Sequence, residues 1–160
     1  MQTQIKPSKR FGALIKFSRE HHYGLLLVWK IRQGIKKNIA AERIADYTLF
    51  FFEHDLRTHF KEEETALFTK LDNDFPMLKR AIQEHQTINT LIDAIRADKK
   101  NFHMLNAFAN ALENHIRFEE RELFNYLQSN LSETVLIELA EKDNAKVCDV
   151  SENWNDKFWN

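Results

Sequence analysis

The stretches HFKEE at residues 59–63 and HIRFE at residues 115–119 are almost copies of each other. Each begins with a histidine and places a glutamate four residues later, at Glu63 and Glu119. Residues four apart lie on the same face of an α-helix, so each stretch directs one imidazole and one carboxylate toward the same neighbour. Imidazole nitrogen and carboxylate oxygen are ligand types that suit iron, zinc and manganese. The repeated motif therefore predicts a helical protein with two ligand-bearing helices.

The composition favours an all-α protein. The 160 residues include only 3 Gly and 2 Pro, too few for the turns of a β-rich fold, and this length is typical of one domain over residues 1–160. A net charge of −1 offers no attraction for nucleic acid, and Cys148, the only cysteine, excludes a cysteine-based metal site. No apolar run reaches the roughly 18–20 residues that span a bilayer, and residues 1–9 lack an apolar signal segment. We therefore expect no nucleic-acid or membrane partner and a cytoplasmic location.

Apolar residues recur at helical spacing in four long segments, residues 8–37, 40–71, 75–97 and 102–129, and in a shorter fifth at residues 133–147. Short polar connections join the long segments, which predicts an up-down-up-down four-helix bundle over about residues 8–130. The short fifth helix and a tail are expected over residues 132–160. The tail carries Trp154, Phe158 and Trp159. These rings either fold back on the bundle or offer a docking surface to a protein partner.

One histidine on each long segment falls at the same depth in such a bundle. The four lie about 10–14 residues, or roughly 15–21 Å, from the same end of the bundle. They are His21, His59, His85 and His115. Glu63 and Glu119 lie one turn away, and burying two carboxylates without partners would be strongly unfavourable. Two divalent cations bridged by both carboxylates would satisfy all six groups; the alternative is a buried His–Glu hydrogen-bond network without metal.

The first histidine of the layer is His21 or its neighbour His22, and periodicity alone leaves both open. With His21 inward, Leu25 and Val28 follow on the same face and Lys30 points outward. With His22 inward, Leu25, Leu26 and Trp29 follow it. Glu62 and Glu120 adjoin the two motif glutamates, and each is expected either to be solvated or to hydrogen-bond a ligand histidine.

The order His, His-x-x-x-Glu, His, His-x-x-x-Glu on four successive helices resembles the hemerythrin-like, or HHE cation-binding, domain. The stretch SREHH at residues 18–22 is also similar to the first helix of bacterial members. The resemblance implies two iron ions, bridged by carboxylates and by an oxo or hydroxo group. It places His21 and His59 on one iron, His85 and His115 on the other, and Glu63 and Glu119 between them.

Two positions depart from the oxygen-carrying hemerythrins. Their fifth histidine, four residues after the third-helix ligand, is Asn89 here. Their last carboxylate is an aspartate five residues after its histidine, whereas Glu119 follows after four. The chain therefore resembles the branch with four histidines and two glutamates, which includes iron-centre repair proteins and sensors of iron or oxygen.

Three functions are consistent with these residues. The first is a di-iron protein that binds or senses a small diatomic ligand, oxygen or nitric oxide. The second is an enzyme in which the same centre reduces peroxide or nitric oxide, or donates iron for cluster repair. The third is a zinc-bound or metal-free interaction module that uses the aromatic tail. Iron over zinc or manganese rests on the family resemblance, because the ligand types suit all three metals.

Overall fold

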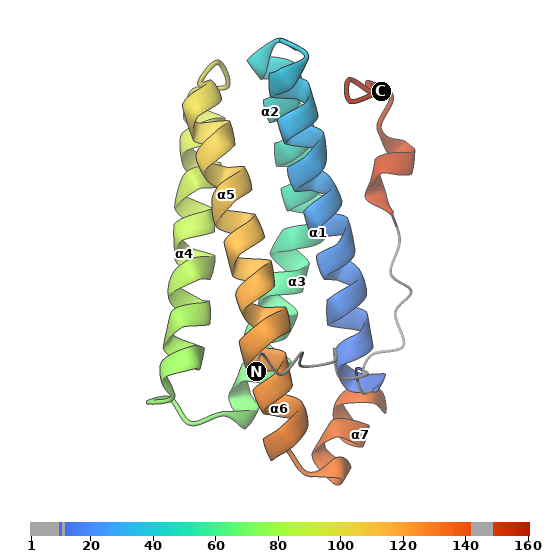
Figure 1. Cartoon of the computed structure of the whole chain (residues 1–160), viewed down its shortest axis with the longest axis vertical. Helices are drawn as coiled ribbons and strands as arrows, with labels where there is room; N and C mark the ends of the chain where they lie inside the picture. The colour runs from blue at the N-terminus through green and yellow to red at the C-terminus, as the bar shows by residue number, and fades with distance from the viewer. Residues whose placement is uncertain (1–9, 11, 142–148) are drawn as a thin grey trace, which may run out of the picture.

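The computed structural model describes residue 10 and residues 12–141 and 149–160, and in this part of the chain every regular element is helical (Figure 1). The first rod is α1, Gly12–Lys36. The second rod comprises α2 (Ala41–Phe51), the π-helix η1 (Phe52–Leu56), α3 (Arg57–Glu62), the π-helix η2 (Glu63–Leu67) and a 3-10 turn, Phe68–Lys70. The third is α4, Pro76–Ala97. The fourth comprises α5 (Phe102–Phe118), the π-helix η4 (Glu119–Leu123) and α6 (Phe124–Asn130), and it is followed by α7 (Glu133–Glu141) and a 3-10 turn, Val150–Asn153.

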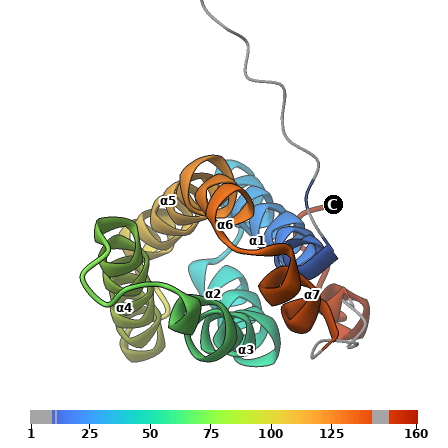
Figure 2. The same cartoon turned by 90° about the horizontal axis from the view of Figure 1, so that it is seen from below.

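The four rods form the predicted up-down-up-down bundle with a short fifth helix (Figure 1). Seen from below, they stand at the corners of a square in which α1 and α4 each contact the second rod and α5 (Figure 2). The helix α7 packs beside the lower end of α1. Residues 142–147 of the expected fifth helix lie outside the described residues, as do residues 8, 9 and 11 of the expected first. No helix in the described ranges combines the length and apolarity required to cross a membrane.

Local sequence signals account for where the rods begin and end. Asn38, with φ of 57°, makes the sharp link between α1 and α2; asparagine tolerates this left-handed conformation better than most residues. Pro76 opens α4 at a position where its missing N–H costs nothing. The side chain of Asn101 accepts a hydrogen bond from the backbone N–H of Met104 and caps α5.

The second rod buries residues at four-residue spacing. The series that carries the ligand candidates is Tyr47, Phe51, Asp55, His59, Glu63 and Leu67, and the adjacent buried series is Ile44, Thr48, Phe52, Leu56 and Phe60. In a pure α-helix a period of four drifts by about 40° per step, because one turn holds 3.6 residues. The π turns η1 and η2 hold more residues per turn and offset that drift. The π turn η4 has the same position relative to Glu119 as η2 has to Glu63.

Two apolar clusters fill the bundle, one above and one below the histidine layer. The upper cluster includes Leu27, Ile88 and Phe108, and the lower includes Leu14 and Phe124. Along α1 and α4, the histidine falls between the residues of the two clusters. The metal-ligand candidates are therefore a polar layer enclosed by apolar packing at both ends.

The C-terminal tail folds back on the bundle, along α1 and α2. Phe158 and Trp159 are buried. Phe158 lies so close to Gly34 that a Cβ there would come within 2.9 Å of its ring. Its packing confirms the first of the two expectations for the tail; docking of a protein partner stays a prediction.

Lys30, which is expected to point outward, is not exposed to solvent. Lys30 is buried, its ammonium lies 4.1 Å from the ring centroid of Trp159, and it donates a hydrogen bond to the hydroxyl of Tyr47 at 3.1 Å. Burial lowers the pKa of Lys30. Helical periodicity correctly places Lys30 away from the bundle core, but the tail covers this side of α1.

Candidate metal centre

Four histidines and two glutamates from the four rods meet in the centre of the bundle. They form two groups of four, and within each group the candidate ligand atoms all lie within 4.8 Å of one another. We call the first group, His21 and His59 with Glu63 and Glu119, the His21 half-site. The second group, which we call the His85 half-site, contains His85 and His115 with the same two glutamates. None of the six side chains is more than 3% exposed.

The two shared glutamates lie between the half-sites. One oxygen of Glu119 is 3.0 Å from Nε2 of His21, and its other oxygen is 3.0 Å from Nε2 of His115. Glu63 places Oε1 at 2.6 Å from Nε2 of His59 and at 3.7 Å from Nε2 of His85. Each carboxylate therefore faces a histidine of both half-sites, which is the geometry that a bridging carboxylate needs.

The structure distinguishes His21 from His22. The His21 side chain is buried in the cluster, whereas His22 is exposed on the outside of α1. Adjacent residues of a helix point about 100° apart, so only one of the two can face the bundle axis. All the other predicted site residues lie in the cluster, and their role as ligands remains a prediction.

Each histidine turns its second nitrogen, Nδ1, toward an outer glutamate. Nδ1 of His21 lies 2.7 Å from Glu120, Nδ1 of His85 lies 3.3 Å from Glu64, and Nδ1 of His115 lies 3.0 Å from Glu84. His59 faces Glu20 at 3.3 Å, without hydrogen-bond alignment. An ionised carboxylate can only accept, so in the three aligned pairs the Nδ1–H donates, and in the neutral imidazole this leaves the lone pair of Nε2 facing the centre. Metal-binding histidines characteristically have such a partner.

Of these outer partners, only Glu120 was expected from the sequence. Glu62, the other candidate, instead accepts a hydrogen bond from Lys16 at 2.8 Å. A signal for the missed residues was present in the chain. The pair Glu-His occurs at residues 20–21 and 84–85, where it includes a clustered histidine, and also at residues 53–54, outside the cluster; His-x-x-x-Glu-Glu occurs at residues 59–64 and 115–120. The whole arrangement is thus duplicated, outer glutamates included.

Aromatic rings cover both half-sites. His21 stacks on Phe124 with ring centroids 5.2 Å apart, and His85 stacks on Phe60 with centroids 4.0 Å apart. Phe17 meets His59 edge-on at 5.8 Å. These rings keep bulk water from the imidazoles and make the centre a region of low dielectric, in which charges interact strongly.

The close packing of carboxylates and imidazoles shifts the pKa values of the groups at the centre. Burial, followed by the nearby charge of Glu119, raises the pKa of Glu63 well above its usual value. Burial opposes protonation of His115, but the close carboxylate of Glu119, 3.0 Å from Nε2, and the hydrogen bond to Glu84 raise its pKa to about 10. Such shifts are expected where carboxylates lie close together without compensating cations.

The buried polar atoms at the centre fit metal binding. Among the described residues, both carboxylate oxygens of Glu63 and of Glu119 lack a hydrogen-bond partner, as do the Nε2 atoms of His21 and His59. Nε2 of His85 faces Nε2 of His115 at 3.1 Å. Buried polar groups normally have a hydrogen-bond partner. These unpaired nitrogen and oxygen atoms are possible metal ligands, and they point at one another. A cation between them would satisfy them, so the residues present fit a metal centre.

Comparison with protein families agrees with this site. The hemerythrin HHE cation-binding domain matches residues 14–127, which include all six clustered side chains. The chain belongs to the hemerythrin HHE cation-binding domain family. Comparisons with curated proteins and with solved structures give no match. Fold, cluster and family together define a helical-bundle protein whose buried histidines and glutamates are suited to bind metal.

Proposed function

We propose that this chain is a non-haem di-iron protein that binds or senses a small ligand, oxygen or nitric oxide. The observation that carries the proposal is the pair of half-sites, each with two imidazoles, which share the carboxylates of Glu63 and Glu119. Di-iron carboxylate proteins likewise build their metal sites from histidines and glutamates that project inward from the helices of a four-helix bundle.

In this proposal His21 and His59 would hold one iron and His85 and His115 the other, with the carboxylates of Glu63 and Glu119 available to both. Two bound irons supply a redox-active pair with coordination positions left for a small ligand. The chain's own side chains orient the imidazoles and enclose the site. The outer glutamates hold the imidazoles with Nε2 inward, and the aromatic rings exclude water.

The enclosure of the site supports a ligand of diatomic size. All six clustered side chains are nearly inaccessible to solvent, and an aromatic ring packs against an imidazole in each half-site. A larger substrate would have to displace several buried rings, which is costly in a close-packed core. The centre is therefore best suited to a molecule of two or three atoms.

Metal analysis tests the ligand set. After anaerobic reconstitution we expect about two irons per chain, as in other carboxylate-bridged di-iron bundles. His21→Ala should lose iron, whereas His22→Ala, one residue away and exposed, should retain the full content. Less than about half an iron per chain, or equal loss in both variants, would contradict the proposal, as would a chain that accepts only zinc.

Optical spectra test the ligand. An absorption band that develops when the reduced, iron-loaded protein meets oxygen or nitric oxide, and that disappears when the gas is removed, is expected for a binder. Rapid turnover of peroxide or nitric oxide, faster than with an equal amount of free iron, would identify an enzyme instead. Circular dichroism of each variant checks that the bundle is intact.

A further inference from the structure

The two half-sites differ in how they are closed on the outside. Behind the His21 half-site, Glu120 is hydrogen-bonded by Ser18 at 2.7 Å and by the guanidinium of Arg10, in addition to His21. Behind the His85 half-site, Glu64 is paired with His85 alone among the described residues, and its side chain is 42% exposed. The His85 half-site therefore has the more open outer side.

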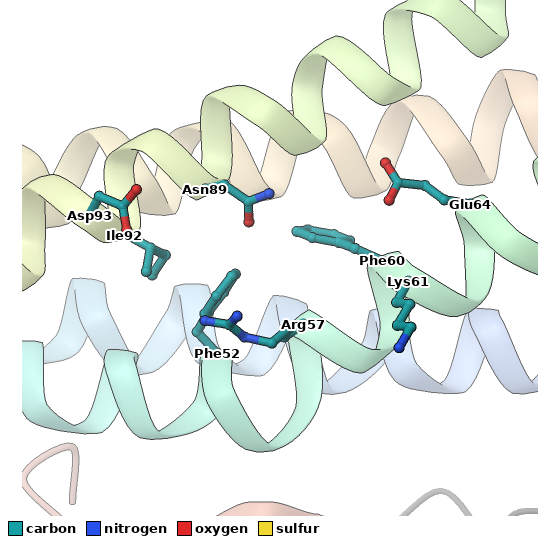
Figure 3. Close-up of a pocket in the computed structure, with 8 residues that line it drawn as sticks. All are labelled: Phe52, Arg57, Phe60, Lys61, Glu64, Asn89, Ile92 and Asp93. Carbon is teal, nitrogen blue, oxygen red and sulfur yellow. The ribbon is translucent and has the colours of Figure 1, made fainter.

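A pocket of about 330 Å³ lies on that open side, between the second rod and α4 (Figure 3). Its lining residues are Phe52, Arg57, Phe60, Lys61, Glu64, Asn89, Ile92 and Asp93. Phe60 and Asn89 point into it from facing helices (Figure 3). Asn89 is the position at which oxygen-carrying hemerythrins have their fifth histidine, so a potential ligand is replaced here by a pocket residue.

Phe60 separates this pocket from the His85 half-site. Its ring lines the pocket, stacks on His85 at 4.0 Å and meets His115 edge-on at 5.7 Å. It is carried by α3, a short α-helical stretch between the π turns η1 and η2. A change in the rotamer of this one side chain would open a path from the pocket to both imidazoles.

The lining of the pocket indicates the class of molecule that it accepts. Phe52, Phe60 and Ile92 are almost fully buried, so they form an apolar floor that is small compared with the polar surface of the rim. At the rim, the two cationic side chains are balanced by the two anionic ones, Glu64 and Asp93. A rim without net charge attracts neither small anions nor small cations, so it favours the entry of a small neutral molecule.

We propose that this pocket is the access site for the small ligand of the centre, and that Phe60 is the gate through which a neutral diatomic molecule reaches the His85 half-site. This inference rests on the proposed function. It adds a route, a gating residue and a preferred half-site.

The gate is tested by rates of nitric oxide binding to the reduced, iron-loaded protein in stopped flow. Phe60→Ala should raise the association and dissociation rates together, by about tenfold each, because a gate changes the barrier and not the end states. Phe17→Ala is the matched control: both rings are 4% exposed and pack on an imidazole, but Phe17 belongs to the His21 half-site. Unchanged rates in Phe60→Ala, or an equal rise in Phe17→Ala, would overturn the proposal.

The pocket is tested from the opposite wall of α4. Asn89→Trp should fill it and slow nitric oxide association by about tenfold without touching an imidazole. Thr90→Trp, at the adjacent exposed position of the same helix, should leave the rate unchanged. Both positions are exposed, so neither variant threatens the core. Equal rates in the two variants would contradict the assignment.

Xenon provides a readout that does not depend on iron. In crystals of the full chain under xenon pressure, density is expected beside Phe60, because xenon occupies apolar cavities; it should vanish in Asn89→Trp. If the chain takes up no iron yet binds xenon there, the proposed function fails and the pocket stands. If iron and nitric oxide bind as proposed but xenon is absent from the pocket, the access route is wrong and the proposed function stands.

Discussion

At the scale of single residues, the two ring nitrogens of each clustered histidine make different contacts. Nε2 faces the centre and Nδ1 faces an outer glutamate, so the outer residue decides where the inner lone pair points. Ion pairing with His115 and Arg80 holds the pKa of Glu84 below its usual value even though partial burial opposes this. The glutamates outside the cluster thus orient the imidazoles of the candidate metal centre.

Replacing Glu84 by glutamine should weaken metal binding about 10–100-fold, because the imidazole of His115 loses a charged partner that fixes its orientation and basicity. The control is Glu122→Gln, which removes a more exposed glutamate that also contacts Arg80. Competition with a calibrated chelator measures both affinities. Equal affinities for the two variants would show that Glu84 does not contribute to metal binding through His115.

At the scale of elements, the π turns allow a four-residue sequence pattern to stay on one face of the second rod. The turn η1 also holds Asp55, which is buried although it is charged in the unfolded chain. Burial, helped by the charge of Glu20 and opposed by His59, raises the pKa of Asp55 to about 7. An acid whose pKa rises on folding destabilises the fold increasingly as the pH rises from about 4 to about 7.

Asp55→Asn should therefore stabilise the protein at pH 8, by up to about 4 kcal/mol, and have little effect at pH 4, where the carboxyl is protonated in the folded state and only about half ionised in the unfolded chain. Denaturant unfolding at the two pH values, with equal metal content in parent and variant, measures the difference. Asp46→Asn on α2 is the control, because Asp46 is exposed and pairs with Lys99 at the surface. A gain at pH 4 as large as at pH 8 would refute the assignment.

At the scale of the whole molecule, the tail completes the bundle on the side of α1 and α2. Arg43 donates two hydrogen bonds to Asp156, at 2.8 and 2.6 Å, and Lys37 donates one to the carbonyl of Trp159 at 3.1 Å. The rings of Phe158 and Trp159 pack on Tyr47, with centroids 5.9 and 4.8 Å away. These contacts lie toward the end of the bundle where α1 meets α2, and they involve none of the clustered side chains.

Trp159→Ala should reduce the free energy of unfolding by about 3–5 kcal/mol, the usual cost of removing a buried aromatic side chain, and should leave the metal content unchanged. Trp29→Ala is the control, because Trp29 on α1 is 47% exposed and its loss should cost little. Thermal unfolding with metal analysis of both variants tests this. Loss of metal in Trp159→Ala would show that the tail supports the centre as well as the fold.

The sequence by itself determined the helical class, the four long rods and the layer of His59, Glu63, His85, His115 and Glu119. These features follow from residue spacing within each helix. The layer follows as well once short connections make successive helices antiparallel, because each depth is then a count of residues from a helix end. The doubled Glu-His and His-x-x-x-Glu-Glu patterns contained the outer glutamates as well, although the spacing did not reveal which histidine each would meet.

Only the tertiary structure selected His21 over His22, buried Lys30 under the tail and placed Asn89 at a pocket. Each of these depends on the rotation of one rod about its axis relative to its neighbours, or on a segment that returns from far along the chain. The apolar stripe on a helix is at least as wide as the about 100° between adjacent residues, so periodicity cannot decide which of two neighbours, such as His21 and His22, faces the bundle axis. Packing against the other rods and the tail does.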